Sequence, residues 1–146
     1  MAYSDRELLA RLIQCEAGGE GDIGMRAVAS VIMNRVHYPY GEYARVGEGN
    51  IRNIIMQPGQ FACVRTTENG RYNPQNIYNM NPTDVHYDIA DWAIAGNRLP
   101  GLGEALWFYN PFSQNCRQNF PSEVGYLIGN YQAHCFYNPT DLYEFT

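Results

Sequence analysis

The sequence has no long apolar run and no basic stripe, and each absence excludes a class of partner. No stretch of the 146 residues is apolar over the length that a helix needs to cross a bilayer, so we expect no membrane span. The formal net charge is −5, which makes nucleic acid and polyanionic ligands unsuitable partners.

A secretory signal is also missing from the start of the chain. Residues 1–7 are polar and mixed in charge, without the apolar segment that such a signal contains. If Met1 is the native start, we expect synthesis in a cytoplasm without export by the usual route. A chain trimmed of its signal would look the same.

Cysteine and histidine are too sparse to form a structural zinc site. Only three histidines are present and no Cys-x-x-Cys pair occurs, so we expect no metal and no cofactor. The four cysteines are Cys15, Cys63, Cys116 and Cys135. An even number permits two disulfides, although a cytoplasmic origin argues against assuming them. Cys116 with Cys135, both in the C-terminal quarter, is the pair to test first.

The rest of the composition is that of an ordinary soluble globular protein. Hydrophobic residues make up 45% of the chain and charged residues 17%. This length allows one domain with a sizeable core, so we expect a single domain over residues 1–146. Aromatic residues reach 14%, and many lie in Asn- and Gly-rich segments, where a role in the core alone is less natural.

Hydrophobic periodicity predicts two adjacent helices at the N-terminus. Ser4 and Glu7 match a capping box, which predicts a first helix over residues 5–17 that two glycines then stop. Asp22 can cap a second helix that runs to about residue 36. The short glycine turn between them predicts an αα-hairpin.

The remaining two thirds of the chain predict shorter elements. We expect a loop over 37–49, a short helix over 50–57, a strand over 61–64, a loop over 65–81 and a helix over 82–95. A loop as long as 65–81 is usually functional in a compact domain.

The C-terminal third predicts a small antiparallel sheet. A strand fits residues 105–109, and residues 126–128 and 134–137 can pair as a hairpin around Gly129-Asn130. Helices followed by a small antiparallel sheet predict the α+β class.

One carboxylate is out of place in the first helix. The apolar stripe of this helix consists of Leu8, Leu9, Leu12 and Ile13. Glu16 lies four residues after Leu12, so its carboxylate should point where the leucines point. Apolar surroundings raise the pKa of a carboxyl group, and an acid still protonated near neutral pH can protonate a leaving oxygen. Glu16 is therefore a candidate general acid for cleavage of a glycosidic bond.

Plainer interpretations stay open for both acids of this segment. Glu16, at the last turn of the helix, can instead tip out to solvent or satisfy backbone N–H groups of the next turn. Glu20 is the weaker catalytic candidate, because Gly18-Gly19 breaks the helical spacing between the two acids. A plain role for Glu20 is to cap the second helix or to balance charge at its start.

Four segments in a fixed order resemble the cell wall hydrolase family, the spore cortex-lytic enzymes of the SleB and CwlJ type. The segments are CEAGGEGDIGMRAVASVIMNRV, IIMQPGQFACV, ALWFYNP and HCFYNPT. The family pattern has a glutamate in E-A-x-G-E, then G-x-x-x-V-A-x-V-x-x-N-R and Q-P-x-x-F. The resemblance spans about residues 8–140. Residues 65–81 match no motif of the family, and Gly18 stands where relatives often carry a larger residue.

The resemblance implies a mostly helical, lysozyme-like or lytic-transglycosylase-like domain that acts on spore cortex peptidoglycan. The family's catalytic glutamate corresponds to Glu16. The length and the absence of a signal and of a separate peptidoglycan-binding domain are similar to the short CwlJ branch. This branch implies a place in the spore coat or cortex after synthesis in the mother-cell cytoplasm, with a spore-coat protein as a possible partner.

A single credible carboxylate favours a lytic transglycosylase, which closes a 1,6-anhydro ring without water or metal. Sugar faces stack on aromatic rings, whereas amides bind hydroxyl and N-acetyl groups. The candidate substrate contacts are Gln57, Gln60, Phe61, Trp107, Tyr109, His134 and Glu20. A core role is at least as good an interpretation of Phe61 and Trp107, and a structural role of His134. Asn34 and Arg35 are interpreted as structural support.

Three rival functions remain open. A hydrolytic muramidase would use Glu16 together with a positioned water, with Glu20 as the base. An amidase that cuts the peptide stem would normally need zinc. A non-catalytic coat or wall-binding module would keep the aromatic residues and dispense with Glu16.

Overall fold

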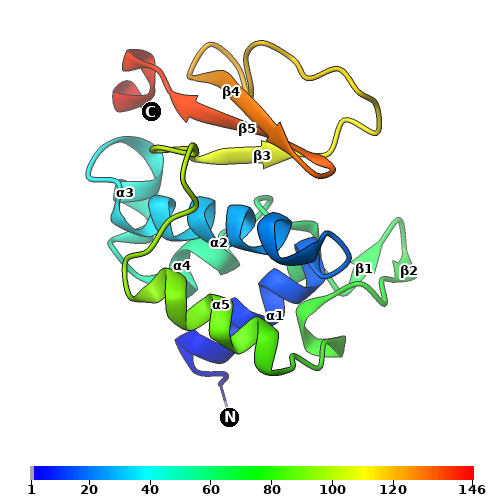
Figure 1. Cartoon of the computed structure of the whole chain (residues 1–146). Helices are drawn as coiled ribbons and strands as arrows, with labels where there is room; N and C mark the ends of the chain where they lie inside the picture. Colours follow the sequence, from blue (N-terminus) through cyan, green and yellow to red (C-terminus); the bar gives the residue numbers. More distant parts are fainter. Residues whose placement is uncertain (1) are drawn as a thin grey trace.

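The computed structural model describes residues 2–146 and separates a group of helices from a three-stranded sheet (Figure 1). The helices are α1 (Asp5–Ala17), α2 (Gly21–His37), α3 (Gly41–Gly47), α4 (Ile51–Met56) and α5 (Asp84–Ile94), with 3-10 helices η1 (Ala62–Val64), η2 (Ile77–Asn79) and η3 (Asp141–Phe145). The strands are β1 (Thr67–Glu68), β2 (Arg71–Tyr72), β3 (Trp107–Tyr109), β4 (Gly125–Tyr131) and β5 (His134–Pro139). This mostly helical arrangement with small antiparallel sheets confirms the α+β class.

Helix α1 begins and ends where its sequence signals predict. The Ser4 hydroxyl accepts a hydrogen bond from the Glu7 backbone N–H at 3.1 Å, which satisfies one free donor of the first turn. The Glu7 carboxylate does not complete the capping box, because it pairs with Arg11 at 2.8 Å. The helix ends at Ala17, before the two glycines.

Helix α2 is the centre of the molecule and is buried on two sides. Figure 1 shows it between the sheet and the pair α1 and α5. Val28 and Ile32 belong to the large core that α1 and α5 share. Ala27 and Val31 pack into a second apolar cluster with residues next to and within the sheet, including Phe136. A helix with apolar residues on two faces can therefore hold the sheet against the helical layer.

Strand β5 is the middle strand of the sheet, and the order is β3-β5-β4 with antiparallel pairing. The hairpin was predicted to turn at Gly129-Asn130, and this was wrong: both residues belong to β4. A register shift between Leu127 and Gly129 lets β4 continue to Tyr131, and the chain turns at 132–133 instead. The β-bulge, which needs tertiary pairing to form, moved the turn.

Two further elements differ from the sequence expectations. Residues 41–47, predicted to be loop, form α3, and Tyr43 on this helix is buried with its N–H bonded to the Tyr143 hydroxyl at 2.9 Å. The helix is short and has a glycine at each end, and this pattern is typical of a loop. Residues 62–64, predicted to be strand, form η1, since Cys63 is tied to α1 by a disulfide and has no strand partner.

Both disulfides form in the structure. The bond between Cys116 and Cys135 agrees with the pair chosen from the sequence. The bond between Cys15 and Cys63 was not anticipated, since 48 positions separate these residues in the chain. Together they anchor the end of α1 and the loop before β4.

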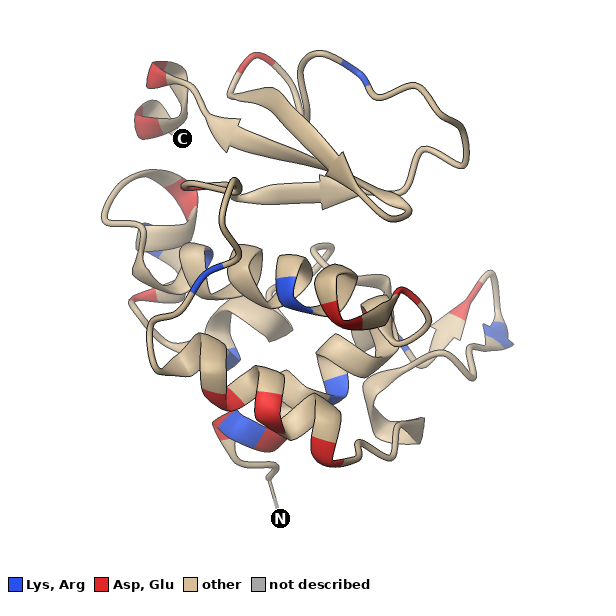
Figure 2. Cartoon of the chain, viewed as in Figure 1, with Lys and Arg blue, Asp and Glu red and all other residues tan. Residues whose placement is uncertain are grey.

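Charged residues gather on the helices and loops and avoid the sheet. Figure 2 shows strands β3, β4 and β5 free of Lys, Arg, Asp and Glu, whereas α5 carries several acidic residues. Strands β3, β4 and β5 therefore contribute no Lys, Arg, Asp or Glu to a site between the two layers. Among residues 2–146, none of the helices combines the length and the apolar character that crossing a membrane requires.

Candidate active site

Glu16 lies on the last turn of α1, where the buried stripe of that helix reaches the protein surface. The leucines and Ile13 of the stripe are at most 1% exposed, as predicted, and Glu16 is partly exposed. The side chain is neither free in solvent nor enclosed in the core. It faces a cleft between the helical layer and the sheet.

The cleft has a volume of about 250 Å³. It is lined by Glu16, Arg35, Gln60, Phe61, Ala62, Phe108, Tyr109, Asn110, Phe112 and His134. The helical layer contributes the two charged side chains, and the sheet and its loops contribute aromatic and amide groups. Glu16 is the one carboxylate among these lining residues.

Burial gives Glu16 an unusual acidity. Loss of hydration raises its pKa from 4.5 to about 7, and the negative charge of Glu20 adds to the rise. The guanidinium of Arg35 and the backbone N–H of Cys63 act in the opposite direction, because both stabilise the carboxylate form. The group is thus able to exist as acid and as base near neutral pH.

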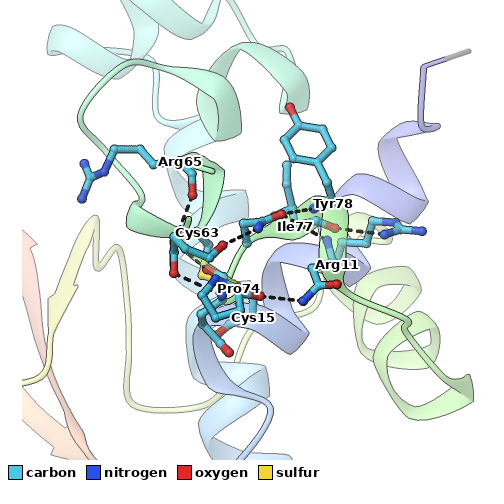
Figure 3. The surroundings of a disulfide bond; sticks show 11 residues. Arg11, Cys15, Cys63, Arg65, Pro74, Ile77 and Tyr78 are labelled. Carbon is cyan, nitrogen blue, oxygen red and sulfur yellow. Dashed lines mark hydrogen bonds between the residues drawn. A yellow bond between two sulfur atoms is a disulfide. The ribbon is translucent and has the colours of Figure 1, made fainter. Parts of the chain in front are cut away.

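A disulfide holds these groups together. Cys15 directly precedes Glu16, and its bond to Cys63 fixes η1 beside the end of α1 (Figure 3). The Cys63 N–H can therefore hydrogen-bond to the Glu16 carboxyl. Gln75 supports the same turn by donating to the Cys15 carbonyl at 2.8 Å.

The segment 65–81, predicted to be a loop, contains β1, β2 and η2 and supports α1 from outside the cleft. Arg11 of α1 donates to the carbonyls of Ile77 and Met80 at 2.9 and 2.7 Å. None of the residues lining the Glu16 cleft comes from this segment. Its contacts are those of a support for the helix that carries Glu16.

Arg35 of α2 lies in the floor of the cleft. It is 4% exposed, its Nε donates to the Leu106 carbonyl at 2.6 Å, and its guanidinium lies over the rings of Tyr43 and Phe61. Its Nη1 has no hydrogen-bond partner. Sequence reasoning treated Arg35 as structural support, yet it had the signal that identified Glu16: a charged residue beside a buried apolar stripe.

Glu20 contacts the sheet instead of the cleft interior. One oxygen, Oε1, bonds to His134 Nδ1 at 2.8 Å and accepts the Ala133 N–H at 3.2 Å. Its side chain makes no capping hydrogen bond to α2, so the capping role suggested from the sequence is wrong. Glu20 joins the turn between α1 and α2 to the tip of the β4–β5 hairpin.

The other residues singled out from the sequence divide into two groups. Gln60, Phe61, Tyr109 and His134 line the cleft with Glu16. Trp107 is buried and borders a neighbouring hollow, whereas Gln57 is not among the residues that line the cleft or its two neighbours, and its Oε1 is buried without a partner. Phe61 is itself 3% exposed, so most of its surface belongs to the core.

The cleft continues into a hollow on each side. One shares Arg35, Gln60 and Phe108 with it, and the other shares Asn110 and His134. Because they share these residues, we call the cleft and the two hollows beside it the groove. Phe112, which the sequence analysis missed, is 90% exposed at this groove with a left-handed φ of 52°.

A comparison with known protein families identifies the family of this chain. Residues 19–137 match the cell wall hydrolase family. The chain belongs to this family.

Other members of the cell wall hydrolase family align over nearly the whole chain. The cell wall hydrolase CwlJ of Halalkalibacterium halodurans is 31% identical over 93% of this chain and 86% of its own length. CwlJ of Bacillus subtilis is 28% identical over 94% of this chain and 87% of its own.

Two solved structures share the fold. The catalytic domain of the Bacillus cereus SleB protein has a TM-score of 0.67 and 27% identity, covering 94% of this chain and 93% of that domain. The catalytic domain of the germination-specific lytic transglycosylase SleB from Bacillus anthracis has a TM-score of 0.65 and 25% identity, with 94% and 98% covered. The resemblance inferred from the motifs is confirmed.

Proposed function

We propose that this protein cleaves the glycosidic bond between N-acetylmuramic acid and N-acetylglucosamine in spore cortex peptidoglycan, as a lytic transglycosylase. The observation that carries this proposal is the single carboxylate, Glu16, among the residues that line the cleft. The related SleB from Bacillus anthracis, described as a germination-specific lytic transglycosylase, supports the reaction type.

In the first step Glu16 is the general acid. Its pKa of about 7 keeps a large fraction protonated near neutral pH. The carboxyl transfers its proton to the glycosidic oxygen as the bond from that oxygen to the muramoyl C1 breaks, which leaves a cation-like centre at C1. The acetamido group of the sugar can stabilise that centre. Arg35 and the Cys63 N–H stabilise the carboxylate that this step creates.

In the second step the Glu16 carboxylate is the base. It takes the proton of the muramoyl C6 hydroxyl, the C6 oxygen bonds to C1, and a 1,6-anhydro ring closes. Glu16 is protonated again and ready for the next bond. Attack by a hydroxyl of the same sugar has a large effective concentration compared with attack by water.

A hydrolytic muramidase is the runner-up, and it needs a base that activates water. Glu20 was the sequence candidate for that base. Its Oε1 is engaged by His134 and by the Ala133 N–H, and Glu20 does not line the cleft. This arrangement favours the mechanism with one carboxylate.

The experiment that tests the proposal is product analysis of cortex fragments digested in ¹⁸O-water. We expect ends in the 1,6-anhydro form that contain no ¹⁸O and resist borohydride reduction. Labelled, reducible ends would establish the muramidase, freed peptides the amidase, and no release at all a non-catalytic binding module.

The matched variant for this digestion is Glu16→Gln, which is nearly isosteric but has no acidic proton. We expect it to retain about a hundredth of the activity or less, since general acid catalysis contributes roughly 10²–10⁴-fold. Full activity in this variant would remove Glu16 from the mechanism.

The proposed function also implies where the protein acts and what it binds. We propose that it acts at the spore coat or cortex, binds glycan strands along the groove, and is positioned there by a spore-coat protein. Fractionation of spores with an antibody against this chain tests the location.

A further inference from the structure

Glu20 and His134 form a pair at the edge of the groove that the two-step reaction does not use. Their side chains are 14% and 9% exposed, and the distance between Glu20 Oε1 and His134 Nδ1 is 2.8 Å. The pair connects segments 114 positions apart in the chain. A contact of this kind either only holds the hairpin or also presents a chemical group to the substrate.

The second nitrogen of the His134 ring is available to a ligand. Nε2 has no hydrogen-bond partner among residues 2–146, and it is not one of the buried atoms without a partner, which are Arg35 Nη1, Gln57 Oε1 and Asn138 Oδ1. Nε2 is therefore open to solvent. His134 lines both the Glu16 cleft and the hollow beside it, so the open side of the ring is the groove side.

Glu20 determines what that nitrogen can do. A carboxylate only accepts hydrogen bonds, so the contact requires the proton on Nδ1. In the neutral ring Nε2 then has a free lone pair and is a hydrogen-bond acceptor. The T-shaped contact with Phe108, at 5.2 Å between ring centroids, restricts rotation of the ring.

We propose that His134 binds the glycan by accepting a hydrogen bond from a sugar hydroxyl at Nε2, and that Glu20 is the positioning residue that fixes the ring for this contact. This inference rests on the proposed glycan-cleaving function. Sugars match the site because each unit offers several hydroxyl donors, and on the sheet side the cleft beside His134 is lined by Phe108, Tyr109 and Asn110, none of which carries a charge.

Two substitutions of His134 separate a substrate contact from a purely structural one. In His134→Gln the side-chain amide reaches the position of Nε2 and the partner of Glu20 is lost. In His134→Asn the amide replaces Nδ1, so the contact with Glu20 is kept and the group facing the groove is lost. Each variant therefore keeps one of the two contacts of His134 and removes the other.

We expect His134→Asn to lose about tenfold or more in kcat/KM on soluble cortex fragments, mainly through KM, the value of one hydrogen bond in a polar site. We expect His134→Gln to retain most of the activity of the folded protein. The reverse order, or equal losses in both, would overturn the proposal. Rates are normalised to the folded fraction from thermal unfolding, and His86→Asn, a buried histidine at the start of α5, is the control.

A double-mutant cycle tests the part assigned to Glu20. Glu20→Met, which removes the acceptor at similar volume, should raise KM in the wild-type background and add little in the His134→Gln background, because its effect passes through the ring. An equal effect in both backgrounds would reject the positioning role. Products distinguish this failure from failure of the proposed function, which would appear as ¹⁸O-labelled ends in every variant.

Discussion

The acidity of Glu16 is a property of its position and not of its type. The apolar stripe of α1 turns the side chain inward, and the helix ends before it can be enclosed, so the carboxyl is partly dry and still reaches the cleft. Burial raises the pKa, and Arg35 and the Cys63 N–H limit the rise to about 7. An isolated acid in the same cleft would hold its proton too firmly to act as a base in the second step.

The pH dependence of activity should report this pKa. General acid catalysis requires protonated Glu16, so kcat/KM should fall about tenfold per pH unit above pH 7. Removing the positive charge in Arg35→Met should shift the fall to higher pH, because Arg35 lowers the pKa of Glu16. Rates on soluble cortex fragments between pH 5 and 9 measure both, with Arg35→Lys as the charge-keeping control. A wild-type profile flat to pH 9 would contradict the assignment of Glu16 as the acid.

The same pKa makes Glu16 a cost to stability in alkaline solution. The unfolded chain releases this proton near pH 4.5 and the folded protein near pH 7, so stability falls as pH rises between these values. Below this range Glu16 has no cost, and above it the cost is complete and no longer changes with pH. The difference corresponds to about 3 kcal/mol. We therefore expect Glu16→Gln to gain up to about 3 kcal/mol over wild type between pH 4 and pH 8 in urea unfolding. The exposed Glu48→Gln is the control, and a difference independent of pH would be inconsistent with the raised pKa.

At the scale of elements, the site is assembled where three segments end. Glu16 is on the last turn of α1, Cys63 is in the three-residue η1, and β5 begins at His134. Ends of elements leave backbone groups and side chains free to face a ligand, whereas their middles are committed to the core. The two disulfides and the Glu20–His134 pair hold these segments next to one another.

Removing the Cys15–Cys63 bond should affect stability and activity together. Loss of a natural cross-link of this span lowers the free energy of unfolding by roughly 2–4 kcal/mol. The Cys15→Ser/Cys63→Ser variant should also lose activity while still folded, because η1 and its N–H are no longer fixed beside Glu16. Chemical unfolding and cortex digestion measure the two effects, and reduction of wild type is the control. Unchanged activity would show that the bond serves stability alone.

At the scale of the molecule, the interface between the helical layer and the sheet makes the groove. Helix α2 supports both layers (Figure 1), and the three-stranded sheet contributes no Lys, Arg, Asp or Glu (Figure 2). The hollows beside the cleft add further lining residues to the site of Glu16. An open groove suits a polymer, because units beyond the cleaved bond can contribute binding. A closed pocket would admit a single small molecule.

Cleavage should therefore depend on the length of the glycan. We expect kcat/KM to rise by about tenfold or more from a two-sugar to a longer fragment, since contacts in the outer hollows add binding energy that the short fragment lacks. Defined fragments separated by size measure this. The exposed Phe112 is a candidate contact for a sugar unit beyond the cleaved bond. Phe112→Ala should therefore reduce the difference in kcat/KM between long and short fragments. Equal rates for all lengths would confine binding to the central cleft.

The sequence by itself determined the two N-terminal helices and the acid. The periodicity of α1 and α2 fixes their buried faces, the Ser4 cap and the paired glycines fix the limits of α1, and the same periodicity turns Glu16 inward. Such signals are local, because residues three and four apart share one helix face whatever the rest of the chain does. The motifs placed the chain in its family on the same local basis.

Only the tertiary structure decided what surrounds that acid. The Cys15–Cys63 bond, the contact between Glu20 and His134, and the approach of Arg35 to the cleft join residues that no spacing relates. Residues 62–64 have the composition of a strand but form η1, because Cys63 is bonded to the distant Cys15. The bulge in β4 likewise moved the turn of the last hairpin. Pairings across the chain depend on which buried surfaces meet, and the pKa of Glu16 depends on those pairings, because burial and neighbouring charge exist only once the layers have packed.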